Sequence, residues 1–250
     1  MDEKEYGQLN FSLPHDIIKL PSKGHFYKSK KSSVKVGYLT AADEDIISSA
    51  VNNNNFLYQL LRNKIYEPDL KVEELLEGDI QTILIFLRNS SFGPEYTVTM
   101  TDPATGKQFT HTFVMDSLDF QKTEHQPDEN GFYTTVLPRT NKSVKIKPLT
   151  FGEKQEIQMM VDKYPSGMVA PQTLWTFTKQ ISEVDGNSDK GFISEFIRTM
   201  PILDSKHLRR FIDSNEPGLD LTIQANAPSG ENVSSRITFG VEFFRPFFGI

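Results

Sequence analysis

The sequence predicts an α+β protein made of two related units, each with a strand, several helices and a small antiparallel β-hairpin. The first observation is a repeat: SVKVGYLTAADEDII, which begins at Ser33, is matched by SVKIKPLTFGEKQEI, which begins at Ser143. The second is that a hairpin-like stretch follows each copy, GPEYTVTMTDPATGKQFTHTF from Gly93 and PGLDLTIQANAPSGENVSSRITF from Pro217. Internal repeats constrain the whole fold, so they decide the predicted organisation.

Length and composition agree with this organisation. The chain has 250 residues, of which 37% are hydrophobic and 24% are charged, and this suits one large domain or two of ordinary size. We expect an extended N-terminal segment over 1–33, a first unit over 34–126 and a second unit over 127–250. The boundary falls in the polar, turn-rich stretch EHQPDENG, which begins at Glu124.

The N-terminal segment is expected to be extended. In FSLPHDIIKLPSKGHFY, Pro14 and Pro21 disfavour helix and Gly24 allows a turn. This stretch lies either on the protein's own domain or on a partner. Its candidate apolar contacts are Phe11, Leu13, Ile17, Ile18, Leu20, Phe26 and Tyr27.

A strand and a capped helix are expected in each unit. Alternating apolar residues predict a short half-buried strand over 34–38. Thr40 then takes the N-cap position with Asp43 three residues later, and in the second copy Thr150 and Glu153 form a more complete capping box. The acidic run that begins at Asp43 fits the positive end of a helix, which explains it without a metal ion.

Apolar residues at helical spacing predict further helices. They are expected at about 56–65, 79–88, 174–181, 191–200 and 203–212, with Asp204 near the cap of the last one. Each would place one apolar face on a core.

Two hairpins are predicted from alternating segments whose connecting loops contain Pro and Gly. EYTVTM from Glu95 pairs with FTHTFVM from Phe109, and LDLTIQA from Leu219 pairs with RITFGVEFF from Arg236. One more strand is expected in GFYTTVLP, from Gly131.

The sequence offers no catalytic or cofactor-binding motif. It has no cysteine, which excludes disulfides, thiolate nucleophiles and thiolate metal sites, and none of its five histidines stands three or four residues from another. The Gly-Lys pair in PATGKQ, from Pro103, lacks the first glycine and the helix of a phosphate-binding loop. We therefore predict no enzyme activity, no cofactor and no metal. A remote alternative is a hydrolase in which His111 or His207 meets an acidic partner in a cleft.

Charge and hydropathy exclude two classes of partner. The net charge is −6, so general affinity for nucleic acid is not expected, and the basic run Lys28, Lys30, Lys31 and Lys35 is interpreted as a solvated loop. No stretch of about 18 apolar residues occurs, and the start MDEKEYGQLN has no apolar signal core, so no membrane partner is expected.

The phenylalanine-rich end of the chain is the strongest functional signal. Phe239, Val241 and Phe243 are expected to share one face of a strand, which Pro246 ends. The aromatic residues either dock into the protein's own core or anchor a partner, because Phe and Arg are enriched at interface centres. The candidate partner-binding residues are Leu20, Phe26, Tyr27, Phe243, Phe244, Arg245, Pro246, Phe247 and Phe248.

Five short segments form a series along the chain: LPSKGHFY from Leu20, VKVGYLTAADED from Val34, FLRNSSFGPEYTVTM from Phe86, PGLDLTI from Pro217 and FFRP from Phe243. In this order and spacing they resemble the baseplate hub and hub-assembly proteins of T4-type contractile-tailed bacteriophages. Members of that family often carry a CPxCG cysteine pair in each hairpin loop, similar to a small zinc ribbon. The corresponding loops here, TDPATGK and NAPSGEN, keep Pro and Gly but lack the thiolates, so we expect no zinc and loops held by turn chemistry alone.

The resemblance implies a role in the virion or in its assembly, exerted by binding other phage baseplate hub proteins. The first hypothesis is a chaperone-like assembly factor for the hub, located in the host cell cytoplasm during phage assembly. The alternative is a permanent structural subunit of the hub, located in the baseplate of the virion tail. An oligomer is one option for its quaternary state. The family is not known as one of enzymes, so it supplies no catalytic residue.

Overall fold

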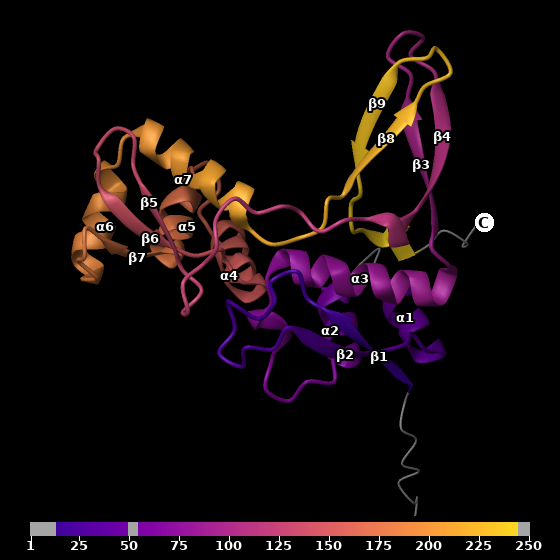
Figure 1. Ribbon diagram of the computed structural model, residues 1–250, viewed down its shortest axis with the longest axis horizontal. Coiled ribbons are helices and arrows are strands. Elements are labelled where there is room, and N and C mark those ends of the chain that lie inside the picture. Colours follow the sequence, from indigo (N-terminus) through magenta and orange to yellow (C-terminus); the bar gives the residue numbers. More distant parts are fainter. Residues whose placement is uncertain (1–13, 50–54, 245–250) are drawn as a thin grey trace, which may run out of the picture.

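The structure is a computed structural model that describes residues 14–49 and 55–244. The described residues form a mixed α+β fold with seven α-helices and four small antiparallel sheets, which confirms the predicted class. Figure 1 shows three parts: a first body, a second body beside it, and an arm of two hairpins that projects away from both. Among the described helices, none has both the length and the apolar content needed to span a bilayer.

The first body contains the N-terminal half of the chain. Its elements are β1 (His15–Lys19), β2 (Ser33–Gly37), α1 (Ala41–Ser49), α2 (Phe56–Lys64), the 3-10 helix η1 (Val72–Glu74) and α3 (Glu77–Phe92). Because β1 pairs antiparallel with β2, the described part of the N-terminal segment lies on the protein's own domain. Helix α3 runs beyond its predicted end at Arg88, since the polar residues after it stay helical until Gly93 turns the chain with a φ of +81°.

The second body contains a three-stranded sheet and four helices. The strands β5 (Tyr133–Val136), β6 (Ser143–Ile146) and β7 (Ile181–Val184) lie in the order β5-β6-β7. The helices are α4 (Phe151–Asp162), α5 (Gln172–Gln180), α6 (Lys190–Thr199) and α7 (Ile202–Asn215). The sequence pattern did not predict strand β7, because β7 follows α5 with no Gly or Pro between them.

The arm consists of the two predicted hairpins, which lie side by side above α3 (Figure 1). Strand β3 (Glu95–Thr101) pairs with β4 (Gln108–Val114), which leads into the 3-10 helix η2 (Met115–Ser117), and β8 (Thr222–Asn226) pairs with β9 (Asn232–Arg236). Along each hairpin, exposed residues alternate with residues that are partly or fully buried, such as Met100 and Ile223.

Two hydrophobic cores organise the bodies. The first core collects side chains from Leu20 to Leu87 and from Met115, and the second collects side chains from Tyr133 to Ile212. The chain then returns to the first core, which also contains Leu219, Leu221, Ile223, Ile237, Phe243 and Phe244. The C-terminal hairpin therefore packs with the first body, although it follows the second body in sequence.

The predicted position of the last strand is wrong. We expected the strand to begin at Arg236, but β9 ends there and a 3-10 helix, η3 (Val241–Phe244), follows. The loop is shorter than expected because Ala227 donates its N–H to the carbonyl oxygen of Glu231 at 2.8 Å, and this brings the residues after Glu231 into the strand. Residues 239–243 consequently share no strand face.

Candidate functional site

The motif LPSKGHFY forms a closed loop between β1 and β2, here called the N-terminal loop (residues 20–32). The N–H of Leu20 donates to the carbonyl oxygen of Ser32 at 2.9 Å and closes the loop at its base. Gly24 has a φ of +77°, and a Cβ there would lie 2.5 Å from the carbonyl oxygen of Lys30. Glycine is therefore required by both backbone conformation and space.

The N-terminal loop is fastened to α3 through a buried carboxylate. Asp79, in the first turn of α3, accepts the N–H of Ser22 at 2.9 Å and the hydroxyl of Tyr27. The oxygen of Tyr27 in turn accepts the N–H of Leu76 at 3.0 Å. Burial raises the pKa of Asp79, and burial together with the adjacent Asp79 raises the pKa of Tyr27. Because Ser22, Tyr27 and Asp79 are all buried, this network has a structural role and holds the N-terminal loop against α3.

Two connecting segments cross over the beginning of α3, and we call this crossing the joint. A Cβ on Gly78 would lie 2.1 Å from the carbonyl oxygen of Pro217 and 2.4 Å from the Cα of Gly218, so backbone lies directly on backbone. The N–H of Gln121 donates to the carbonyl oxygen of Gly218 at 2.8 Å. The segment before the second body and the segment after it are thus held together on α3.

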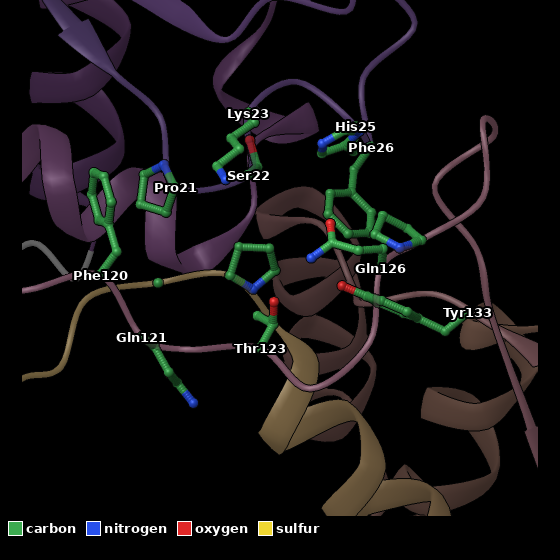
Figure 2. Close-up of a pocket in the computed structure, with 13 residues that line it drawn as sticks. Pro21, Ser22, Lys23, His25, Phe26, Phe120, Gln121, Thr123, Gln126 and Tyr133 are labelled. Carbon is green, nitrogen blue, oxygen red and sulfur yellow. The ribbon is translucent and has the colours of Figure 1, made fainter.

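A cavity of about 100 Å³ lies at the joint (Figure 2). Figure 2 shows Ser22 and Phe26 of the N-terminal loop, Phe120 and Gln121 of one connecting segment, and Tyr133 of the second body around it. This volume suits a few water molecules and is well below the roughly 300 Å³ at which ligand pockets begin. Among the described residues, no group of three or more His, Cys, Asp or Glu is placed to hold a metal ion.

A charged cluster joins the two bodies beside the cavity. Lys154 of α4 lies 3.4 Å from Glu216, which follows α7, and 3.6 Å from Glu77 of α3. Burial raises the pKa of Glu216, Lys154 lowers it, and the nearby charges of Glu77 and Asp213 raise it further. One lysine therefore pairs with two carboxylates, and the charge of a third, Asp213, acts on Glu216.

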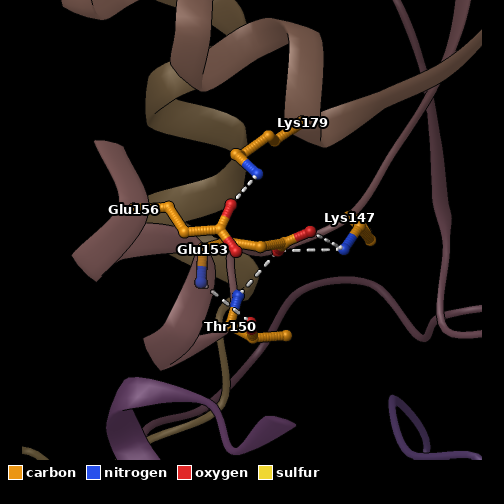
Figure 3. Close-up of polar contacts among 5 residues, drawn as sticks. All are labelled: Lys147, Thr150, Glu153, Glu156 and Lys179. Atoms are coloured by element: carbon orange, nitrogen blue, oxygen red, sulfur yellow. Dashed lines mark hydrogen bonds and ion pairs between the residues drawn. The ribbon is translucent and has the colours of Figure 1, made fainter. Parts of the chain in front are cut away.

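The predicted Thr150 capping box is present, and the first copy shows one half of such a box. Thr150 accepts the N–H of Glu153 at 3.2 Å, while the Glu153 carboxylate accepts the N–H of Thr150 at 3.0 Å and binds Lys147. Figure 3 draws these contacts. In the first copy, Asp43 accepts the N–H of Thr40 at 2.7 Å. Asp43 also forms a buried ion pair with Lys64.

Arg88 anchors the base of the arm, and the sequence analysis did not identify it. Its buried guanidinium donates to the carbonyl oxygens of Gly93 and of Glu95, the latter at 2.6 Å, and lies 5.2 Å from the ring centroid of Tyr96. Burial lowers the pKa of Arg88. This cation links the end of α3 to the first residues of β3, so it fixes the direction in which the arm leaves the body.

A carboxylate also joins the tips of the two hairpins. Asp102, at the end of β3, accepts the hydroxyl of Ser229 at 2.8 Å and the N–H of Ala104 at 2.9 Å. Although burial acts in the opposite direction, the hydrogen bonds from Ser229 and Ala104 lower the pKa of Asp102. The expectation that turn chemistry alone holds these loops is therefore corrected: a bond between the two loops adds to it.

The predicted partner-binding residues divide into two groups. Leu20, Tyr27, Phe243 and Phe244 are buried in the protein's own first core, and Phe26 is partly buried against the ring of Tyr133. The other predicted residues, Arg245, Pro246, Phe247 and Phe248, lie outside the described residues, as do Phe11 and Leu13. The buried group docks inside the chain, and partner binding by the whole set stays a prediction.

The two histidines of the hydrolase alternative lie in different parts of the fold. His111 lies on β4 in the arm, opposite Val98. His207 lies on α7 of the second body, where its Nε2 is 3.0 Å from the hydroxyl of Thr135. The two residues therefore lie apart in the fold, and each is half-buried.

Comparisons with known proteins identify one family. The sequence profile described as T4 bacteriophage base plate protein matches residues 14–245, which is most of the chain. A search of curated proteins finds no match. A search of solved structures finds no match either.

Proposed function

Because this chain belongs to the T4 bacteriophage base plate protein family, we propose that it is a baseplate hub protein and acts as an assembly factor for the hub. Membership implies that it binds other phage baseplate proteins, and the proposal adds that those partners are hub proteins. Its place of action is then the host cell cytoplasm during phage assembly.

The observation that supports this proposal is the arm. Buried polar bonds hold the arm at both ends, through Arg88 at its base and Asp102 at its tip. A projection fixed in this way loses little conformational entropy when it binds, which favours association. Its strands also carry edges that are unpaired among the described residues, and such edges are common sites of protein association.

The second candidate function is a permanent structural subunit of the hub. The joint supports it, because backbone packed on backbone at Gly78 and Gly218 holds the two bodies in one arrangement. A particle component needs such a fixed shape throughout its life. In that case the protein stays in the baseplate of the mature tail.

We also propose that the chain consists of two related units, with the division near residue 126. Two local features support a duplication. Thr40 and Thr150 each stand between a strand and a helix and engage the residue three positions on. Each hairpin tip also carries a Pro followed by a glycine with positive φ, at Gly106 and Gly230.

The test is co-expression of the chain with candidate hub proteins, followed by size-exclusion chromatography, together with mass spectrometry of purified mature tails. An assembly factor co-elutes with a hub protein and is absent from mature tails. A permanent subunit co-elutes and is present at a fixed stoichiometry. If the chain co-elutes with none of them and its deletion leaves tails intact, the proposal is wrong.

A further inference from the structure

The outer edge of β4 presents backbone groups that are unpaired among the described residues. Within the described part of the chain, strand β4 pairs only with β3, and Figure 1 shows β4 on the side of the arm that faces away from the second body. In an antiparallel pair, residues alternate between those bonded to the partner strand and those whose N–H and C=O point away.

Two hydrogen bonds at the ends of the hairpin show which residues of β4 point away from β3. The N–H of Met115 donates to the carbonyl oxygen of Pro94, and the N–H of Asp102 donates to that of Lys107, both at 2.9 Å. The register between these ends is regular, so the residues of β4 bonded to β3 are Phe109, His111 and Phe113. The backbone groups of Gln108, Thr110, Thr112 and Val114 therefore point outward.

A side-chain contact supports this alternation. Thr97 and Thr112 face each other across the hairpin, and their hydroxyl oxygens are 2.7 Å apart. Side chains approach this closely at the pairs that lack backbone hydrogen bonds to each other. Thr112 is therefore one of the residues whose backbone groups point outward.

This edge lacks the usual protection against strand pairing. Exposed edges normally carry charges, prolines or bulges, and β1 follows that rule with Asp16 and Lys19. Strand β4, QFTHTFV, contains no Asp, Glu, Lys, Arg or Pro, and its pairing with β3 is free of bulges. On β8 the edge is shorter, and the N–H of Thr222 is already bonded to the Asp220 carboxylate at 3.0 Å.

We propose that β4 pairs with β4 of a second copy of this chain, antiparallel about a two-fold axis. Such an axis places every residue opposite a residue of the same strand, so a charged residue would often face a like charge. Because β4 contains no Asp, Glu, Lys or Arg, this repulsion does not arise at any position of the strand. The strand that pairs with β4 is therefore one from a second copy. Pairing with a strand of another protein is the alternative result that the test below can detect.

This dimer has a specific register. The two-fold axis lies at Thr110, where no ionisable side chain faces its own copy. Gln108 then faces Thr112 of the second copy, so three of the four outward residues pair within the strand. Phe109 then lies opposite His111 of the second copy, a cross-strand aromatic pair. A single added strand buries less than the roughly 1,600 Å² of a standard interface, so we expect a weak dimer whose population rises with concentration.

A single introduced thiol tests the register, because the chain has no cysteine of its own. In Thr110→Cys the two Cα atoms would lie about 5.5 Å apart across the axis, within the range of a disulfide. The matched control is Thr99→Cys, since Thr99 is exposed and lies opposite Thr110 within the hairpin. Its two copies would be three strand spacings apart, about 14 Å. Mild oxidation should link the first variant into a dimer and leave the second monomeric.

Analytical ultracentrifugation over a range of concentrations tests the dimer itself. Thr110→Lys brings two like charges together at the axis and should weaken the dimer by roughly tenfold or more, whereas Thr99→Lys should leave it unchanged. A wild-type chain that stays monomeric at every concentration overturns the proposal, and so does equal cross-linking of both cysteine variants. Either result leaves the binding of hub proteins unaffected, and loss of that binding in Thr110→Lys alone would point to a strand from another protein.

Discussion

At the scale of single residues, buried polar groups decide how the parts are held. Asp79, Arg88 and Asp102 are each buried. Asp79 and Asp102 bind segments distant in sequence, and Arg88 binds the backbone directly after its own helix. Burying such a group is costly unless its hydrogen bonds are made, so each fixes one arrangement of the segments around it.

Removing the hydroxyl of Tyr27 tests the network that holds the N-terminal loop against α3. In Tyr27→Phe the N–H of Leu76 and one oxygen of Asp79 lose their partner, so the free energy of unfolding should fall by about 1–3 kcal/mol. The matched control is Tyr38→Phe, whose hydroxyl binds Asp16 at the surface and whose removal should have a much smaller effect. Urea unfolding followed by circular dichroism measures both. Equal effects would show that the Asp79 network does not hold the loop.

The pH dependence of Glu216→Gln tests the charged cluster. The folded pKa of Glu216 is raised, so its contribution to stability is present below the unfolded pKa of about 4.3 and is lost as pH rises through the folded pKa. Glutamine resembles the protonated acid, so the variant should gain stability relative to wild type at pH 7 and lose this gain near pH 4. The free energy of unfolding, measured for wild type and Glu216→Gln from pH 4 to pH 7, tests this prediction. The surface variant Glu156→Gln is the control. A gain that is independent of pH would contradict the account.

At the scale of elements, local patterns predicted much of the structure. The strand over 34–38, the Thr150 capping box and the β3–β4 hairpin are confirmed, because each depends on neighbours in sequence. The last strand was misplaced because loop closure at Ala227 is a matter of turn geometry that apolar alternation does not reveal. Asp204 lies in the first turn of α7, near its cap as expected, and it also accepts the N–H of Arg139 at 2.7 Å, a contact that no sequence pattern indicates.

Substitution of Gly78 tests the joint between elements. In Gly78→Ala the Cβ meets backbone of residues 217 and 218, which cannot move like a side chain, so stability should fall by about 1–3 kcal/mol or more. Gly240→Ala is the control, because nothing lies within 4 Å of its Cβ position. Thermal unfolding of the two variants gives the comparison. Indistinguishable melting temperatures would mean that the two segments are not in contact.

Substitution of Asp102 tests the bond between the hairpin tips. In Asp102→Ala the amide hydrogens of Ser229 and Ala104 lose their acceptor and should exchange faster with solvent, while Asp116→Ala should leave them protected. The folded pKa of Asp102 is lowered, so its contribution to stability is present above the unfolded value of about 3.9 and is lost as pH falls through the folded pKa. Unchanged exchange at the two amides of Asp102→Ala would exclude the bond.

At the scale of the whole molecule, the order of the segments along the sequence differs from the way in which they pack together. The repeat predicted a first unit that ends near residue 126 and a second that continues to residue 250, but the first core also takes side chains from Leu219 onward. The sequence could not reveal this, because a return of the chain to its first core depends on contacts between distant segments. It did indicate which segments matter: LPSKGHFY forms the N-terminal loop, and PGLDLTI passes over α3 at the joint.

The identity of the bound proteins tests the central claim, which is that this chain works by binding other baseplate proteins. The measurement is mass spectrometry of the proteins that co-purify with the tagged chain from infected cells, with an untagged infection as the control. We predict that baseplate hub proteins are enriched in fixed proportion to the chain. A chain that purifies with no baseplate protein, in an infection that yields normal tails without it, would contradict the account.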